Sequence, residues 1–504
     1  MIEDELKLSV SGPFSLPDLT TQGIPGLADV RAAGVRTLRA TYWDTSDLRL
    51  ARNGLTLRYR TGEDVPPWQL KIPVPSRGRG VREELGEPGQ PDQPPGPLRA
   101  LVTGWVRTAV LAPVATLRTE RATFELLDSA GDELAELVDD RVSVLAGRTV
   151  SREFREIEIE RRGADDATLN RLRDALVGAG AVEGEFLPKV VQALGPLATA
   201  PSDLPAVPAV TADGPAGDVV GYALAASVRR LVAHHGPVRR DAPDAVHQMR
   251  VACRRLRSDL RTFAPLVEAD WADGLRAELA WLAGVLGAAR DLEVLRERIA
   301  AATGDDPQAP LDDSAVRDID AILAERQLAA VADVEAALAE PRYALLLERV
   351  VEAARHPALP AAAQEPAATA LPPLVGTAWR KLARRARLLA PDGPDADWHQ
   401  VRIRAKRARY AAEASTPALG APAGRLGAAA ESIQDLLGQH QDCVVAAETL
   451  LDIAGQARGD TVLAVTCGRL AERERAAARE VRTGFPAVWA AARRPKNTSW
   501  LAPA

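Results

Sequence analysis

Charged side chains alternate with apolar ones in several short segments near the N-terminal end of the chain. Glu156, Glu158 and Glu160 alternate with two isoleucines, and Arg58 and Arg60 flank a tyrosine. Successive side chains of a β-strand point to opposite faces, so each segment predicts a strand with one charged face. Carboxylates bind hard divalent cations through oxygen, whereas Arg and Lys bind phosphate oxygens. Together the segments predict a site for a polyanion that carries a metal ion.

The first residues of the chain continue this pattern. Glu3, Glu5 and Lys7 share one face of a predicted strand, and shorter charged segments surround Lys71 and Arg118. Carboxylates on one strand face repel each other unless a cation or bases on a neighbouring strand compensate them. A closed sheet would place these charges inside a barrel, with the apolar faces outward beneath helices. A solvated sheet face is the alternative interpretation for any single strand.

Two later segments each carry one histidine followed by bases at helical spacing. On a helix these residues form a single stripe, because they lie three or four positions apart. The two stripes contain His247, Arg250, Arg254 and Arg257 in the first copy, and His399, Arg402, Lys406 and Arg409 in the second. A Leu-Gly pair and an Asp follow each copy, at 286–291 and 437–442. The matching order predicts a duplication, and two facing stripes would bind a phosphate chain through several contacts. A solvated helix face is the alternative for one stripe alone.

These patterns divide the chain into parts. Residues 1–195 contain short alternating segments separated by Gly and Pro, which predicts a β-rich domain, and 196–217 is a Pro/Ala/Gly-rich linker. Residues 218–495 are helical in pattern, and 496–504 form a tail. The duplication predicts two four-helix bundles related by a pseudo-twofold axis. The expected fold class is α+β in two domains.

Length and composition limit the remaining interpretations. The 504 residues have a net charge of −6 and a pI of about 5.7, so a basic surface for nucleic acid is not predicted. No apolar run is long enough to span a membrane. Three cysteines, Cys253, Cys443 and Cys467, indicate a reducing compartment, and the cytoplasm is the expected location. The oligomeric state stays open.

The N-terminal segments resemble, in their order, the CYTH domain of the triphosphate tunnel metalloenzyme family. The matching motifs are Glu3-x-Glu5-x-Lys7, Tyr42-x-Asp44-Thr45 with Leu48, Leu57-Arg58-x-Arg60, Lys71, Arg82-x-Glu84, Arg118, Asp139, Glu156-x-Glu158-x-Glu160 and Pro188-Lys189. The resemblance covers nearly all of residues 1–195. It implies an eight-stranded antiparallel β tunnel that hydrolyses or cyclises triphosphates with Mg²⁺ or, as the alternative, Mn²⁺.

The same resemblance implies residue roles. The metal ligands would be Glu3, Glu5, Glu156, Glu158, Glu160 and Asp139, with the neighbouring Asp140 as the alternative to Asp139. The phosphate contacts would be Lys7, Arg58, Arg60, Lys71, Arg82, Arg118 and Lys189. The catalytic residues would be Glu3, Glu5, Lys7 and Lys189. Pro188 stands where the family typically has Ser.

The basic stripes resemble the CHAD domain, a helical module with conserved histidines, over about residues 218–495. This resemblance implies binding of inorganic polyphosphate. The implied contacts are His247, Arg250, Arg254, Arg255, Arg257, His399, Arg402, Lys406, Arg407 and Arg409, with Arg230 and Lys381 as outer contacts. Asp291 and Asp442 would position the stripe arginines, and the two histidines are either ligands or core residues.

The expected function is metal-dependent hydrolysis of tripolyphosphate or a related triphosphate, together with polyphosphate binding by the helical domain. The expected location extends to polyphosphate granules. One alternative is a non-catalytic polyphosphate-binding protein, although a pure polyanion binder gains nothing from inward carboxylates. Adenylyl cyclase activity is a further alternative, but it needs an adenine and ribose site that no motif indicates.

Overall fold

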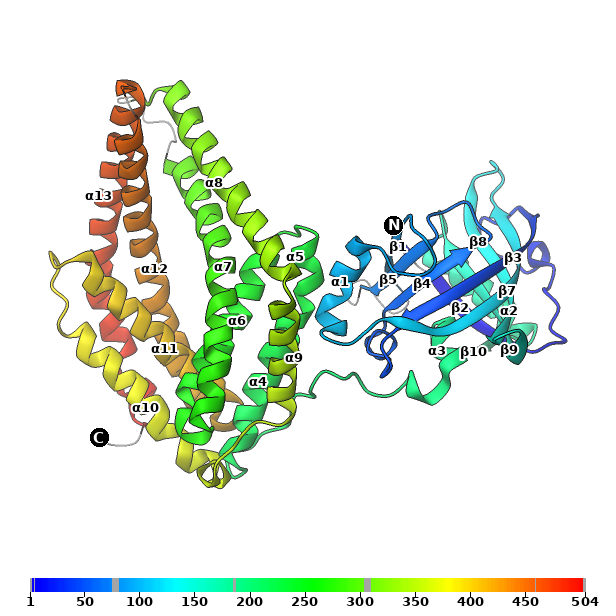
Figure 1. Ribbon diagram of the computed structural model, residues 1–504, viewed down its shortest axis with the longest axis horizontal. Helices are drawn as coiled ribbons and strands as arrows, with labels where there is room; N and C mark the ends of the chain where they lie inside the picture. The colour runs from blue at the N-terminus through cyan, green and yellow to red at the C-terminus, as the bar shows by residue number, and fades with distance from the viewer. Residues whose placement is uncertain are drawn as a thin grey trace. The chain divides into compact units, whose positions relative to one another are not determined.

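The chain forms two compact units, Met1–Asp203 and Leu204–Ala504, in a computed structural model (Figure 1). The structure describes residues 2–3, 5–74, 81–184, 187–302, 310–457 and 459–501, and for residues 2, 3 and 302 only the backbone. The boundary between the units falls inside the segment 196–217. Each unit has its own core, and each is described separately.

The N-terminal unit is built on one antiparallel sheet with the strand order β1-β6-β5-β4-β3-β7-β8-β9-β2-β10. Its strands are β1 (Ile2–Glu3), β2 (Glu5–Val10), β3 (Asp29–Asp44), β4 (Thr56–Thr61), β5 (Trp68–Pro73), β6 (Arg82–Glu87), β7 (Ala112–Leu127), β8 (Glu133–Ala146), β9 (Thr149–Arg161) and β10 (Val182–Glu183). The N-terminal stretch pairs with β6 through β1 and with β9 through β2. It therefore closes the sheet into a barrel of eight strands, counting β1 and β2 as one strand and leaving β10 outside the ring. The expected antiparallel tunnel is confirmed.

Helices cover the apolar outer faces of these strands. Helix α2 (Asp166–Gly178) packs Leu172 and Leu176 against Ile157 and Ile159 of β9, all of which are buried. Helix α1 (Gly96–Val106) packs in the same way over β4 and β5. Because apolar side chains take the outer face, the alternating charged side chains must point inward.

A short helix fills one end of the barrel. Helix α3 (Lys189–Leu194) packs Val190 and Val191 against apolar residues of β3, β7 and β8. The helix begins at Lys189, so this side chain enters the barrel interior beside the apolar cluster.

The second unit is entirely helical in its described residues. Its helices are α4 (Ala216–Ala233), α5 (His235–Arg239), α6 (Ala245–Thr262), α7 (Ala269–Ala302), α8 (Asp313–Ala339), α9 (Pro341–Arg355), α10 (Ala367–Ala386), α11 (Asp395–Leu419), α12 (Ala421–Gln456), α13 (Thr461–Ala492) and α14 (Pro495–Thr498). Helices α4, α6, α7 and α8 recur in order as α10, α11, α12 and α13. This recurrence confirms the pair of four-helix bundles. None of the described helices is long and apolar enough to span a membrane.

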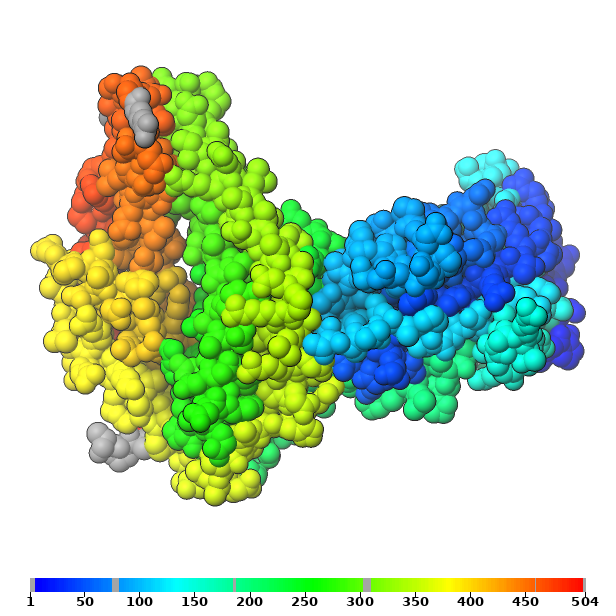
Figure 2. Space-filling view, viewed as in Figure 1, coloured from blue at the N-terminus to red at the C-terminus, as the bar shows by residue number. Residues whose placement is uncertain are grey.

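The two halves of the helical unit pack against each other along their length, as Figure 2 shows in green for the first half and in yellow to red for the second. Leu295 of α7 and Ile319 of α8 share a buried cluster with Leu450 of α12 and Leu470 of α13. The two halves thus share one buried apolar cluster, while α10, α11, α12 and α13 of the second half also pack around a separate one.

Candidate functional site

The barrel encloses a cavity of about 730 Å³ whose lining is rich in charged side chains of both signs. Its acidic wall consists of Glu5, Glu136, Glu158 and Glu160, from β2, β8 and β9. Its basic wall consists of Arg58, Arg60, Lys71 and Arg82, from β4, β5 and β6. In the ring of eight strands, β9 lies half the circumference from β4, and β8 lies half the circumference from β5. The two walls therefore face each other across the cavity.

An acidic cluster lies at the inner side of the acidic wall. Carboxylate oxygens of Asp140, Glu156 and Glu158 come within 4.8 Å of one another. The strand register explains this proximity, because Asp140 pairs directly with Glu156 across β8 and β9. In the same way, Lys7 of β2 pairs directly with Glu158 of β9. The cluster is therefore a product of adjacent strands and not of sequence neighbours.

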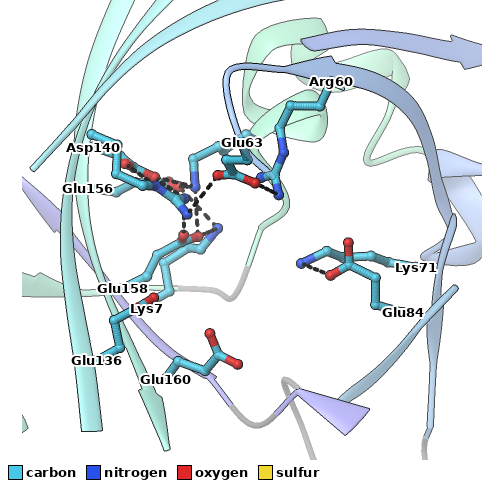
Figure 3. A network of polar contacts seen from close by, with 12 residues as sticks. Lys7, Arg60, Glu63, Lys71, Glu84, Glu136, Asp140, Glu156, Glu158 and Glu160 are labelled. Carbon is cyan, nitrogen blue, oxygen red and sulfur yellow. Dashed lines mark hydrogen bonds and ion pairs between the residues drawn. The ribbon is translucent and has the colours of Figure 1, made fainter. Parts of the chain in front are cut away.

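Two ammonium groups bind this cluster. The Lys189 Nζ lies 2.9 Å from Asp140, 2.7 Å from Glu156 and 2.8 Å from Glu158. The Lys7 Nζ lies 3.1 Å from Glu156 and 2.7 Å from Glu158. Arg121 of β7 adds two hydrogen bonds to the Asp140 carboxylate, at 2.9 and 2.7 Å. Figure 3 shows these contacts converging at one side of the cavity.

Burial and ion pairing have opposite effects on the pKa values of the charged groups in this cluster. Burial by itself lowers the pKa of Lys189, but the carboxylates of Glu156 and Glu158 outweigh it and hold that pKa well above its usual value. Burial likewise opposes ionisation of Glu158, yet Lys189 and Lys7 hold the pKa of Glu158 well below its usual value. Lys189 and Glu158 are therefore both charged at neutral pH.

The basic wall is held by a different set of partners. The Arg58 Nε donates to Gln69 at 2.7 Å, and the Lys71 Nζ lies 3.2 Å from Glu84. Arg60 forms an ion pair with Glu63, a residue of the loop between β4 and β5. Burial and the neighbouring Arg58 lower the pKa of Arg60 to about 10. Positive charge is thus concentrated on this wall, which favours an anionic ligand.

The structure corrects two sequence-based placements. Arg118 is exposed on the outer face of β7, and Arg121 lies in the cavity instead. Asp139 points outward and forms an ion pair with Arg155 at 2.6 Å, whereas Asp140 belongs to the acidic cluster. Arg121 is three residues from Arg118, and Asp140 is one residue from Asp139. Because side chains alternate between the two faces of a strand, a shift by an odd number of residues places a side chain on the opposite face.

Other site residues divide into those that were found and those that were missed. The side chain of Glu3 lies outside the described residues. The cavity holds Glu5, Lys7, Arg58, Arg60, Lys71, Arg82, Glu158, Glu160 and Lys189 as expected, and Glu156 lies directly beside it. Sequence reasoning missed Arg121, Glu63 and Glu136. The alternation of Thr119, Arg121 and Thr123 could have indicated the inward face of β7, but its outward face is equally polar.

The donor set of the acidic wall fits a divalent cation. All its candidate ligands are carboxylate oxygens, which Mg²⁺ and Mn²⁺ prefer. Burial raises the pKa of Glu160, and the nearby carboxylate of Glu136 adds to this effect against the opposing charge of Arg162. Arg162 donates to both carboxylate oxygens of Glu160, at 2.6 and 3.2 Å, so a cation bound at Glu160 would compete with this guanidinium group.

In the helical unit, the two basic stripes come together where α6 and α11 pack. The Arg250 Nη1 lies 2.8 Å from Asp291, which supports the positioning role expected for that Asp. Gly287 lies beside the Arg250 guanidinium, and Gly438 lies beside that of Arg402 in the same way. The two Leu-Gly pairs of the repeat therefore lie next to equivalent stripe arginines.

The pKa of Lys406 shows that the two stripes lie close together. Burial and the charges of Arg402, Arg254 and Arg250 lower its pKa to about 7. Arg254 and Arg250 belong to α6, so residues of the opposite stripe act directly on this ammonium group. An anion bound between the stripes would relieve this repulsion.

The other expected polyphosphate contacts are arranged differently. Arg255 and Arg409 both bind Glu413, at 2.6 Å each, and Arg409 also binds Glu431 at 2.7 Å. The remaining ones are Arg257 and His247, half-buried on α6; Arg407, half-buried on α11; and Arg230 and Lys381, exposed on α4 and α10. The His399 Nδ1 lies 2.5 Å from the Gln441 Oε1. The least neutralised part of the stripes is therefore the part around Lys406.

Comparisons with known proteins agree with this two-part architecture. The family model of the CYTH domain matches residues 1–179, and that of the CHAD domain matches residues 222–451. Two Mycobacterium tuberculosis proteins named as uncharacterized, from strains CDC 1551 and H37Rv, are 33% identical over 493 residues, covering 90% of this chain and 89% of theirs.

Two solved structures are also similar. PptA from Streptomyces chartreusis is 26% identical, with a TM-score of 0.47 over 55% of this chain and 99% of its own. The CHAD domain from the plant Ricinus communis is 25% identical, with a TM-score of 0.43 over 57% of this chain and 95% of its own.

Proposed function

Because this chain belongs to the family in which a CYTH domain is followed by a CHAD domain, we propose that its barrel hydrolyses inorganic tripolyphosphate or a related triphosphate with Mg²⁺. We propose further that residues 218–495 bind inorganic polyphosphate. Both activities suit the cytoplasm and polyphosphate granules. The observation that carries the proposal is the cavity with a carboxylate wall facing a basic wall.

The chain's own residues supply binding and orientation. Arg58, Arg60, Lys71 and Arg82 contact the non-bridging oxygens of the triphosphate from one side. Arg121 lies between this wall and the acidic cluster, so it can contact the phosphate nearest the carboxylates. Lys7 and Lys189 neutralise the cluster and place two ammonium groups at the same end. The substrate is thus held along a line between the walls.

The acidic residues hold the cation and orient water. Glu5, Glu158 and Glu160, with Asp140 and Glu156 behind them, would hold Mg²⁺, which would neutralise the charge that develops on the phosphate oxygens. A carboxylate of the same wall accepts a hydrogen bond from the attacking water. Hydrolysis by positioning and electrostatics requires no covalent nucleophile, and residues 1–195 contain no histidine for a phosphohistidine route.

The experiment measures phosphate release from tripolyphosphate, ATP and long-chain polyphosphate, with and without Mg²⁺. We expect Mg²⁺-dependent release from tripolyphosphate, and a loss of about 10² to 10³ in kcat for Glu158→Gln. Glu120→Gln removes the same charge at an exposed site of β7 and serves as the matched control. Release that is independent of Mg²⁺, or unaffected by Glu158→Gln, would refute the catalytic proposal.

Polyphosphate binding by the helical unit is tested separately. We expect Arg254→Gln and Arg402→Gln to weaken binding of long-chain polyphosphate and to reduce its salt dependence, because each removes one phosphate contact. Arg317→Gln, which removes an exposed base from α8 outside the stripes, is the control. Equal effects of all three variants would indicate a general charge effect and not a site.

The second candidate function is a polyphosphate-binding protein without catalysis. The observation in its favour is that Lys7 and Lys189 already neutralise the acidic cluster at ion-pair distance. In that case, no triphosphate would release phosphate at any Mg²⁺ concentration, while long-chain polyphosphate would still bind. A cyclase is the less economical proposal, because tripolyphosphate hydrolysis needs only the charged walls described above, whereas a cyclase also needs a site for adenine and ribose.

A further inference from the structure

One acidic residue of the cavity comes from a loop on the basic side, opposite the carboxylates of the acidic wall. Glu63 lies in the loop between β4 and β5, and its side chain is only 16% exposed. Its carboxylate forms an ion pair with Arg60 and lies 3.8 Å from the Arg121 Nη1 (Figure 3). A carboxylate between two guanidinium groups occupies the position that phosphate oxygens take at such sites.

The loop is built to hold Glu63 there. The preceding Gly62 has a φ of 102°, which side-chain-bearing residues rarely adopt. A Cβ atom at Gly62 would also collide with the backbone oxygen of Thr37 on β3. The loop therefore lies directly against β3, and only glycine allows the close approach that brings Glu63 to the arginines.

The two arginines differ in what else they bind. Arg121 also binds Asp140 at 2.7 Å and Glu158 at 3.3 Å, so it stays paired without Glu63. Within the described residues, Glu63 is the sole ion-pair partner of Arg60. The Arg60 Nε is buried and has no hydrogen-bond partner. Arg60 thus has an unused donor beside a single, loop-borne carboxylate.

We propose that Glu63 is a built-in competitor of the substrate, which holds Arg60 and Arg121 in place until a phosphate group of the triphosphate displaces it. This inference rests on the proposed function of the barrel. Any phosphate group that contacts Arg60 must first displace the Glu63 carboxylate, at the same cost in free energy for each ligand. Glu63 would therefore weaken binding of the triphosphate and of shorter phosphates alike, and would limit inhibition by the products.

The test is steady-state hydrolysis of tripolyphosphate by Glu63→Gln, with pyrophosphate as a competitive inhibitor. Loss of the competing charge is expected to lower both the KM and the inhibition constant of pyrophosphate by about tenfold, the effect of one charge-assisted contact. Glu63→Ala is a second variant, which removes the side chain and should shift both constants in the same direction.

Glu120→Gln is the matched control, because it removes the same charge from an exposed position of β7 that does not line the cavity. We expect changes below about twofold for this variant. Unchanged constants in both Glu63 variants, or an equal fall in Glu120→Gln, would overturn the inference. A higher KM would also overturn it, since Glu63 would then position Arg60 for binding.

These results are separable from those on the proposed function. Hydrolysis by the unaltered protein with no effect of Glu63 would overturn this inference alone. Absence of hydrolysis in the unaltered protein would overturn the proposed function and this inference with it. Isothermal titration with pyrophosphate in EDTA gives an independent comparison of Glu63→Gln with Glu120→Gln, in which only the former should bind more tightly.

Discussion

Replacing Lys189 by Met should destabilise the N-terminal unit and make it dependent on a divalent cation. The Lys189 ammonium makes three ion pairs of 2.7 to 2.9 Å with the acidic cluster, and its side chain is 10% exposed. Removal of one partner from a buried ion-pair network typically costs about 3 to 5 kcal/mol, because the remaining charges are left uncompensated. For a unit of this size, each kcal/mol corresponds to a shift of roughly 2 to 4 °C in Tm.

The pH dependence follows from the direction of the pKa shifts. In the folded protein, the ion pairs hold the pKa of Glu158 well below its ordinary value of 4.5. Its contribution to stability is present above pH 4.5 and is lost as the pH falls through the lower folded-state pKa. Lys189→Met weakens this contribution, so the difference from the unaltered protein should be largest at neutral pH and should shrink in acid.

Urea unfolding is the appropriate assay, because urea does not screen charges as guanidinium does. Hydrogen exchange of β8 and β9 assigns the transition to the N-terminal unit, and Arg118→Gln controls for loss of one positive charge at an exposed site. Mg²⁺ should restore more stability to Lys189→Met than to the unaltered protein. A variant as stable as the unaltered protein at pH 7, or one that Mg²⁺ does not stabilise, would refute the reasoning.

Three further predictions concern the two sites. Arg121→Gln should raise the KM for tripolyphosphate by about tenfold or more, because it removes a charged phosphate contact. Arg118→Gln should leave the KM unchanged. Equal KM values for the two variants would contradict the placement of Arg121 in the cavity and Arg118 outside it. Polyphosphate affinity of the helical unit should fall by up to about tenfold from pH 6 to pH 8, because Lys406, with its pKa of about 7, loses its proton over this range. Lys406→Arg should abolish this dependence in a binding titration, and a persistent dependence would assign it to another group. Addition of Mg²⁺ at about 100 times its Kd should stabilise the N-terminal unit by about 3 kcal/mol, and EDTA should reverse the resulting shift in Tm.

Local patterns were sufficient for much of the fold and for part of the site. The alternation of Glu156, Glu158 and Glu160 with isoleucines specified a charged and an apolar face, because the strand repeat is two residues. The structure places Glu158 and Glu160 at the cavity and Glu156 directly behind it. The spacing of His247, Arg250 and Arg254 likewise specified a helix with one basic face, and the second copy of this spacing predicted the duplication.

The same reasoning was wrong where both faces of a strand are polar. Strand β7 carries charged or polar side chains on both faces, and its buried Leu117 and Leu126 lie on opposite faces, so its apolar residues do not indicate which face lines the cavity. Arg118 was expected inside, and Arg121 is there instead. Asp139 and Asp140 are neighbours in sequence, so the sequence does not show which of the two carboxylates points into the barrel. The structure does, because Asp139 forms an ion pair with Arg155 on the outside.

The sequence by itself determined the alternation of charges, the repeat of the helical half and the types of donor available for a phosphate and a cation. Only the tertiary structure decided which charges meet. Lys189 reaches Asp140 and Glu158 because α3 enters the barrel end, and Glu63 reaches Arg60 and Arg121 because Gly62 lets its loop lie against β3. The reason is that side-chain alternation depends on a few neighbouring residues, whereas burial and Coulomb interactions depend on distances through space that strand register and barrel closure set.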